Sequence, residues 1–114
     1  MIDSIGETIV RVVGPLVPVY LSEAETENYP YAVYELQSTP RLTKDGVAGY
    51  DGVAVINIYG KDFDELQALS DAMVEGLVAL NADPEWAVQV ASQSKSCTEG
   101  VWVLTTNLQI NQLG

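Results

Sequence analysis

The stretch VAVINIYGKDFDELQALSDAMVEGL, residues 53–77, decides the fold, because a strand pattern runs directly into a helix pattern. Residues 53–60 are almost all β-branched or aromatic, which is typical of a strand whose two faces are both apolar. Asp62 then offers a side-chain cap, and Glu65 stands three residues further on, as in a capping box. Apolar residues follow at spacings of three and four, namely Phe63, Leu66, Leu69, Met73, Leu77 and Leu80. We therefore expect a helix over about 62–80 that packs Leu66, Leu69, Met73 and Leu77 on the sheet.

Three more strands are predicted around this unit. Residues 29–39 alternate between two faces, and residues 86–98 and 100–112 form two further strand patterns joined by a turn at Glu99-Gly100, which predicts an antiparallel hairpin. Residues 39–52, TPRLTKDGVAGYDG, contain a proline and three glycines, and this composition indicates a long loop.

The N-terminal part adds one helix. Its apolar residues recur at spacings of three and four, and they are Ile2, Ile5, Ile9, Val12 and Val13. Gly14-Pro15 ends the pattern, so we expect a helix over about 2–13 followed by an irregular acidic connector over 16–28. The predicted fold is a single α+β domain, residues 1–114, in the order α-β-β-α-β-β. It is a two-layer sandwich in which two helices cover one face of a mostly antiparallel four-stranded sheet.

The inventory of side chains excludes several function classes. Five Lys and Arg stand against 16 Asp and Glu, a formal charge of −11, which argues against a surface that grips nucleic acid. The chain has no histidine and one cysteine, Cys97, so zinc sites and Ser-His-Asp or Cys-His catalysis are excluded. We therefore predict no enzyme activity, no catalytic residue, no cofactor and no metal. No apolar run approaches the roughly 20 residues of a membrane span, and the N-terminus lacks a signal-peptide pattern, which indicates an intracellular protein without a membrane partner.

The second face of the predicted sheet is the informative feature. If the helices cover residues such as Ile56 and Leu104, the other face presents seven side chains, more apolar surface than a monomer normally exposes: Tyr31, Val33, Val53, Val55, Tyr59, Val101 and Val103. Either another subunit or the connector over 16–28 covers this face.

Several of these segments, taken together, resemble a known protein family. A Pro-Tyr step entering the first strand in NYPYAVYELQ, a Gly-rich stretch, the strand VAVINIYG and the capped helix KDFDELQALSDAMVEGL resemble the tail terminator, or tail-completion, proteins of long-tailed bacteriophages. The resemblance covers about residues 1–112.

The resemblance implies a structural role. A tail terminator forms a hexameric ring at the head-proximal end of the tail, ends tube growth and joins the tail to the head. Its partners are the tail tube and connector proteins, and genomic DNA passes through without tight binding. Six copies at −11 carry −66 formal charges, and an acidic wall repels phosphate. The expected location is the virion, and the host cytoplasm during assembly.

The expected interface residues combine the second face with the Gly-rich stretch, which holds two of the five positive charges. They are Arg41, Lys44, Val33, Val53, Val55, Tyr59 and Val103. Two other functions stay open at this point: another phage connector, neck or tail-tube-like subunit, and a small ligand-binding domain of ferredoxin-like type.

Overall fold

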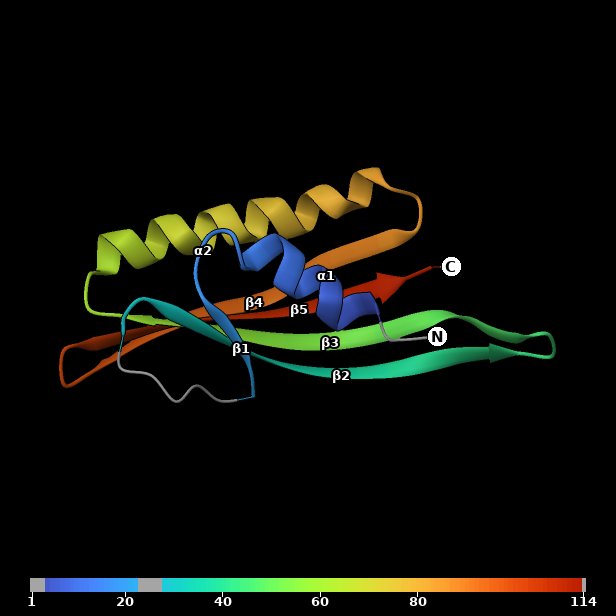
Figure 1. Ribbon diagram of the computed structural model, residues 1–114, viewed down its shortest axis with the longest axis horizontal. Helices are drawn as coiled ribbons and strands as arrows, with labels where there is room; N and C mark the ends of the chain where they lie inside the picture. Colours follow the sequence, from blue (N-terminus) through green and yellow to red (C-terminus); the bar gives the residue numbers. More distant parts are fainter. Residues whose placement is uncertain (1–3, 23–27, 114) are drawn as a thin grey trace.

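The computed structural model describes residues 4–22 and 28–113. Two helices lie side by side on one face of a five-stranded sheet, and the molecule measures 52 × 27 × 22 Å (Figure 1). The elements in chain order are α1 (Ser4–Val13), β1 (Val19–Leu21), β2 (Tyr31–Thr43), β3 (Gly46–Gly60), α2 (Phe63–Val78), the 3-10 helix η1 (Ala79–Ala82), β4 (Trp86–Thr98) and β5 (Val101–Gln112).

The predicted four-stranded, mostly antiparallel sheet in α-β-β-α-β-β order is wrong. The sheet is mixed and has the strand order β1-β2-β3-β5-β4, and the added strand, β1, lies inside the segment predicted to be an irregular connector. Val19, Tyr20 and Leu21 pair in parallel with Ala32, Val33 and Tyr34 of β2. Three residues are too few to show an alternating pattern. A parallel pair of strands is also not joined by a tight turn, so no turn signal marks β1 in the sequence.

The predicted long loop over 39–52 is also wrong, because β2 and β3 continue through it. The two strands pair from Tyr31–Tyr59 out to Thr43–Gly46, with one register irregularity between Arg41 and Leu42. Pro40 is tolerated in β2 because β1 pairs only with residues 32–34, so beyond them β2 is an edge strand where a missing N–H breaks no ladder bond. The end of this hairpin projects past the helices (Figure 1). We call residues 39–50 the arm.

The long helix α2 begins as predicted. The Asp62 side chain accepts a hydrogen bond from the Glu65 backbone N–H at 3.2 Å, which caps the helix. Leu66, Met73 and Leu77 are buried against the sheet, whereas Leu69 is only half-buried and Ser70 takes the remaining buried position. The buried face of α2 therefore contains Ser70 at the place where the spacing predicts Leu69.

Gly76 of α2 permits a close contact with α1. A Cβ placed on Gly76 would lie 2.9 Å from Cγ1 of Val12 in α1. The absence of a side chain at Gly76 therefore leaves room for Val12 between the two helices.

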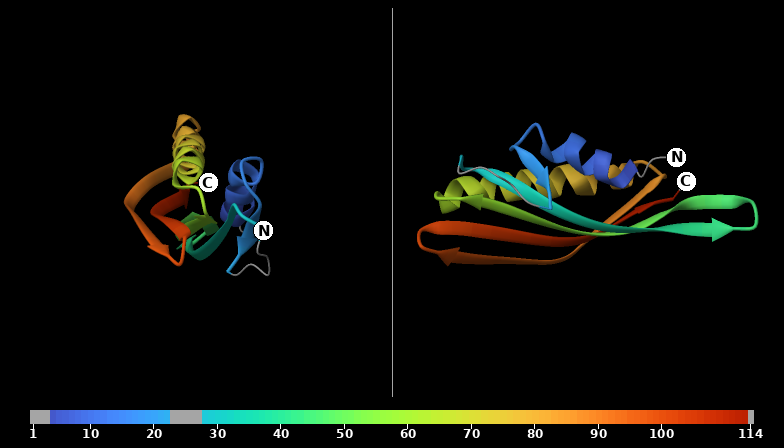
Figure 2. Two further views of the ribbon diagram at one scale, coloured as in Figure 1. Left: turned by 90° about the vertical axis from the view of Figure 1, so that its left-hand side faces the viewer. Right: turned by 60° about the horizontal axis from the view of Figure 1, so that its bottom comes forward.

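The core lies between the helices and the sheet. Ile5, Ile9 and Val13 of α1 are buried against side chains from three strands, listed by strand as Ala32 and Tyr34, Ala54, Ile56 and Ile58, and Leu104, Leu108 and Ile110. These strand residues alternate along their strands, so one face of the sheet is covered and the other faces away from the helices (Figure 2).

The hairpin of β4 and β5 turns at Glu99 and Gly100, as predicted, and both residues have positive φ, +53° and +81°. β4 forms one edge of the sheet and β1 the other (Figure 2). Near its start, the outward backbone groups of Val88 bond to the side chain of Asn81: the Val88 N–H donates to Oδ1 at 2.6 Å, and Nδ2 donates to the Val88 carbonyl at 2.9 Å. An amide side chain thus takes the place of a neighbouring strand at this one position.

Candidate subunit interface

The face of the sheet turned away from the helices contains the predicted interface side chains. The strand register places them in rows across β2, β3 and β5, and the first row is Tyr31, Tyr59 and Val103. Tyr59 and Val103 are thus neighbours, as the prediction requires.

Tyrosines gather around this first row. The rings of Tyr31 and Tyr59 stack at 5.0 Å between centroids, and Tyr29 stacks on Tyr31 at 5.5 Å. Tyr20 of β1 meets Tyr31 edge-on at 6.3 Å, and Lys61 Nζ lies 5.6 Å from the Tyr29 ring. Burial, and then the neighbouring hydroxyls of Tyr29 and Tyr59, raise the pKa of Tyr31 above its ordinary value of 10.0. Sequence reasoning missed Tyr20, because its contact with Tyr31 depends on β1, and it also missed Tyr29, which lies just before β2.

The three remaining valines do not join this row. Val33 is only 7% exposed and pairs with Asn57 and, through β1, with Tyr20. Val55 lies half-buried between Glu35 and Asn107, and Val53, 54% exposed, lies between Gln37 and Gln109. Polar residues therefore separate the valines, and the face is an interleaved surface instead of a continuous apolar patch.

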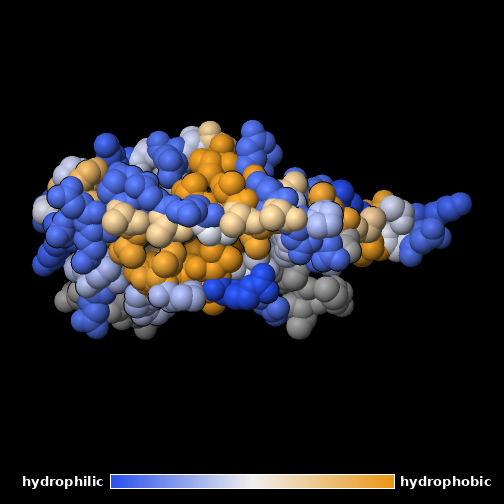
Figure 3. Space-filling model, turned by 90° about the horizontal axis from the view of Figure 1, so that it is seen from above, coloured by the Kyte–Doolittle hydropathy of each residue, from blue (hydrophilic) through white to orange (hydrophobic). Residues whose placement is uncertain are grey.

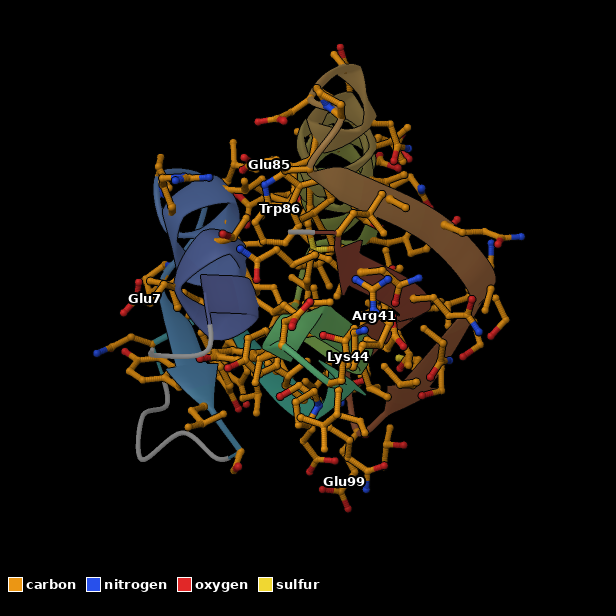
Figure 4. The ribbon with its side chains drawn as sticks, turned by 90° about the vertical axis from the view of Figure 1, so that its right-hand side faces the viewer. Glu7, Arg41, Lys44, Glu85, Trp86 and Glu99 are labelled. Carbon is orange, nitrogen blue, oxygen red and sulfur yellow. The ribbon has the colours of Figure 1, made fainter. Side chains whose placement is uncertain are left out.

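The arm carries the two predicted cationic residues, Arg41 and Lys44, and only Arg41 is paired within the described chain. Arg41 Nη2 donates to the Gln112 carbonyl at 2.6 Å, and Arg41 Nε lies 3.3 Å from Asp51 Oδ1. Arg41 thus ties the base of the arm to the end of β5 and to Asp51 of β3. Lys44 is exposed at the turn, and Figure 4 looks onto this end of the molecule.

The tip of the arm is also apolar, which sequence reasoning missed. Leu42 and Val47 face each other across the two strands, and they are 74% and 54% exposed. The Thr43 hydroxyl donates to the Gly46 carbonyl at 3.1 Å and accepts from the Asp45 N–H at 3.2 Å, so the turn is closed by its own side chain. The signal available in the sequence was an Asp-Gly turn flanked by Leu42 and Val47, the pattern of a hairpin.

Residues 4–22 and 28–113 contain no group of three or more Cys, Asp or Glu placed to hold a metal ion. Within the same ranges no helix is long and apolar enough to cross a membrane. Cys97 is an exposed free thiol on β4. A pocket of about 200 Å³ between α2 and the β4–β5 hairpin is lined by polar residues such as Gln67, Gln93 and Lys95.

Comparison with known proteins gives a fold. No protein-family model matches the chain, and no curated protein matches it. Among solved structures, the chain is similar to one in a structure described as "Virion of native gene transfer agent (GTA) particle". The TM-score is 0.62 at 13% sequence identity, over 93% of this chain and 84% of the other. At this identity the likeness establishes a shared fold.

Proposed function

We propose that this protein is a structural subunit of a phage-like virion, and specifically a tail terminator or tail-completion subunit that forms a ring. The observation that carries the proposal is the fold shared with a chain of a virion over 93% of the sequence. The resemblance of residues 1–112 to tail terminators, which arose from sequence alone, supports the finer assignment.

The exposed surface supports assembly between copies. The arm projects apolar side chains, Leu42 and Val47, that nothing in the described chain covers, and the sheet face away from the helices adds Val53, Val55, Tyr59 and Val103. These features lie on different parts of the molecule, so a contact that uses both joins unlike surfaces. Such heterologous contacts close into rings when the rotation between copies permits it.

The charge supports passage of DNA without tight binding. A formal charge of −11 per copy repels phosphate, and of the two cationic residues on the arm Arg41 already pairs with Asp51. A ring of such subunits presents DNA with a surface that does not hold it.

A second candidate is another virion subunit of the same fold, such as a connector, neck or tail-tube-like protein, because the description of the similar structure names a virion and no part of it. The ferredoxin-like ligand-binding alternative is weaker. The pocket between α2 and the β4–β5 hairpin, at about 200 Å³, is below the roughly 300–1,000 Å³ of typical ligand sites, and the larger hollow of about 490 Å³ beside Val74 and Val78 is an open groove.

Native mass spectrometry and negative-stain electron microscopy of the purified chain test the proposal. A tail terminator gives one closed ring, expected to be a hexamer, that binds the ends of purified tail tubes and does not grow. A tail-tube-like subunit instead polymerises into long tubes. A chain that stays monomeric at all concentrations and does not bind tube ends contradicts the proposal. Tight duplex binding that weakens steeply with salt contradicts the proposed passage of DNA.

A further inference from the structure

The outer face of α2 contains an open groove that lies apart from the predicted interface residues. Asp71, Val74, Glu75 and Val78 stand at positions i, i+3, i+4 and i+7, so they form one face of the helix. With Ala79 and, from β4, Gln93, they line an open groove of about 490 Å³. Val78 is 41% exposed, and Figure 3 shows apolar surface along the flanks of α2.

The groove is lined by both apolar and acidic side chains. Val74, Val78 and Ala79 supply its apolar lining, and Asp71 and Glu75 supply its acidic lining. The Asp71 carboxylate already accepts a hydrogen bond from Gln67 Nε2 at 2.9 Å, whereas no ion pair of Glu75 is found among the described residues. The groove therefore fits a segment with one or two aliphatic side chains beside a positive charge.

The arm has this chemistry. Leu42 and Val47 form an exposed cross-strand aliphatic pair, and Lys44 follows Leu42 by two residues. The other lysines are engaged elsewhere: Lys61 contacts the Tyr29 ring, and Lys95 Nζ lies 5.1 Å from the centre of the Phe63 ring. Lys44, in the part of the chain that the structure describes, has neither an ion pair nor a ring contact.

The arm is also preorganised for docking. The hydrogen bond of Arg41 to Gln112 and its ion pair with Asp51 fix the base of the arm. The hydrogen bonds of the Thr43 hydroxyl close the turn at the tip. A hairpin that is already ordered loses little conformational entropy when it binds. In its own chain the arm projects past the helix layer and away from the groove (Figures 1 and 3), so the two surfaces meet only between copies.

We propose that the arm of one copy docks in the α2 groove of the next copy. Leu42 and Val47 rest on Val74 and Val78, and Lys44 pairs with Glu75. The contact is head-to-tail, so each copy has one arm to give and one groove to fill, and a closed ring leaves neither exposed. The inference rests on the proposed function, because it supplies the contact that builds the ring.

The apolar half of the contact is tested by Leu42→Ser and Val78→Ser. Each is expected to raise the concentration at which the assembly half-dissociates by about tenfold or more, because the lost aliphatic area is worth more than the 1.4 kcal/mol that a factor of ten represents. Val10→Ser on α1 is the matched control, since Val10 is 42% exposed and lies outside the groove. Thermal unfolding at low concentration checks that each variant folds.

The charged half is tested by a charge swap. Lys44→Glu and Glu75→Lys are each expected to weaken assembly about tenfold, and the double variant is expected to recover most of the loss, as coupled charge pairs across an interface do. Arg11→Glu and Glu85→Lys, which reverse charges of the same signs outside the arm, the groove and the tyrosine cluster, are expected to leave assembly unchanged.

The outcomes separate this inference from the proposed function. If the wild-type chain forms rings but Leu42→Ser and Val78→Ser rings are as stable as wild type, or the double charge swap is no better than the single changes, the docking inference is overturned and the ring proposal stands. If the wild-type chain never assembles, both fail.

Discussion

Replacing Val55 with lysine separates the stability of the subunit from the stability of its assembly. Val55 lies half-buried on the sheet face away from the helices, directly between Glu35 of β2 and Asn107 of β5. The lysine stem covers part of the surface that the valine covered, and its ammonium group comes opposite Glu35, a cross-strand pair worth about 0.2–1 kcal/mol. The free energy of unfolding is therefore expected to change by less than about 1 kcal/mol, a shift in Tm of less than about 5 °C.

Assembly responds differently if a neighbouring copy covers this face. A lysine buried at a contact without an added partner costs about 3–5 kcal/mol, which is a factor of roughly 10²–10⁴ in the dissociation constant. Thermal unfolding of dilute protein measures the first quantity, and sedimentation velocity over a concentration series measures the second. Leu16→Lys, an exposed position after α1, is the control for adding a positive charge.

Two results would refute this reasoning in different ways. A Val55→Lys chain that unfolds contradicts the position of Val55 on an open face. A folded variant that assembles as well as wild type removes Val55, and the surface beside it, from the interface.

Three further predictions concern the subunit itself. Asp62→Ala removes the α2 cap and is expected to lower the free energy of unfolding by about 1 kcal/mol, measured by chemical denaturation. Gly76→Ala is expected to give no stabilisation in the wild-type chain, because the new Cβ meets Val12, but to stabilise a Val12→Ala chain by up to about 1 kcal/mol; equal effects in the two backgrounds would contradict the close contact. The raised pKa of Tyr31 means that the folded chain holds this proton more tightly than the unfolded chain, so its contribution to stability is complete below pH 10.0 and is lost as the pH rises through the folded value. Tyr31→Phe is expected to reduce that alkaline loss in urea unfolding series, and an unchanged loss would assign it to other groups.

The elements that the sequence predicted correctly are those whose signals are local. The Asp62 cap, the spacing of Leu66, Met73 and Leu77, and the Glu99-Gly100 turn each lie within a few residues of what they determine, and each is present in the structure. Such signals need no knowledge of distant parts of the chain.

The errors arose where the same residue type occurs in two different structural settings. Proline and glycine in residues 39–52 indicated a loop, yet Pro40 lies on an unpaired strand edge, and Gly52 is buried where a Cβ would lie 2.9 Å from the Ile110 carbonyl oxygen and 3.1 Å from Ile5 Cδ1. Gly52 is needed for close packing, which a single sequence does not distinguish from a turn. β1 was missed for another reason: its three residues form a strand only because β2 is beside them.

The candidate interface was predictable in composition but not in arrangement. Val53, Val55, Tyr59 and Val103 share a face, as alternation requires, but the polar neighbours that separate them depend on the register between strands. The arm was recognised by its charges, whereas its exposed aliphatic pair follows from the pairing of Leu42 with Val47.

The exposed edge of β4 is poorly suited to pair with strands of other chains. Asn81 occupies the edge at Val88, and further along β4 the sequence SQSKS, residues 92–96, is polar and contains Lys95. An unpaired edge recruits other strands into fibrils most readily when it is long, flat and apolar, and charge or polarity along it slows that recruitment. If copies meet through their arms and grooves, as we propose, then productive contacts use other surfaces than the β4 edge, and that edge remains a poor template for misassembly.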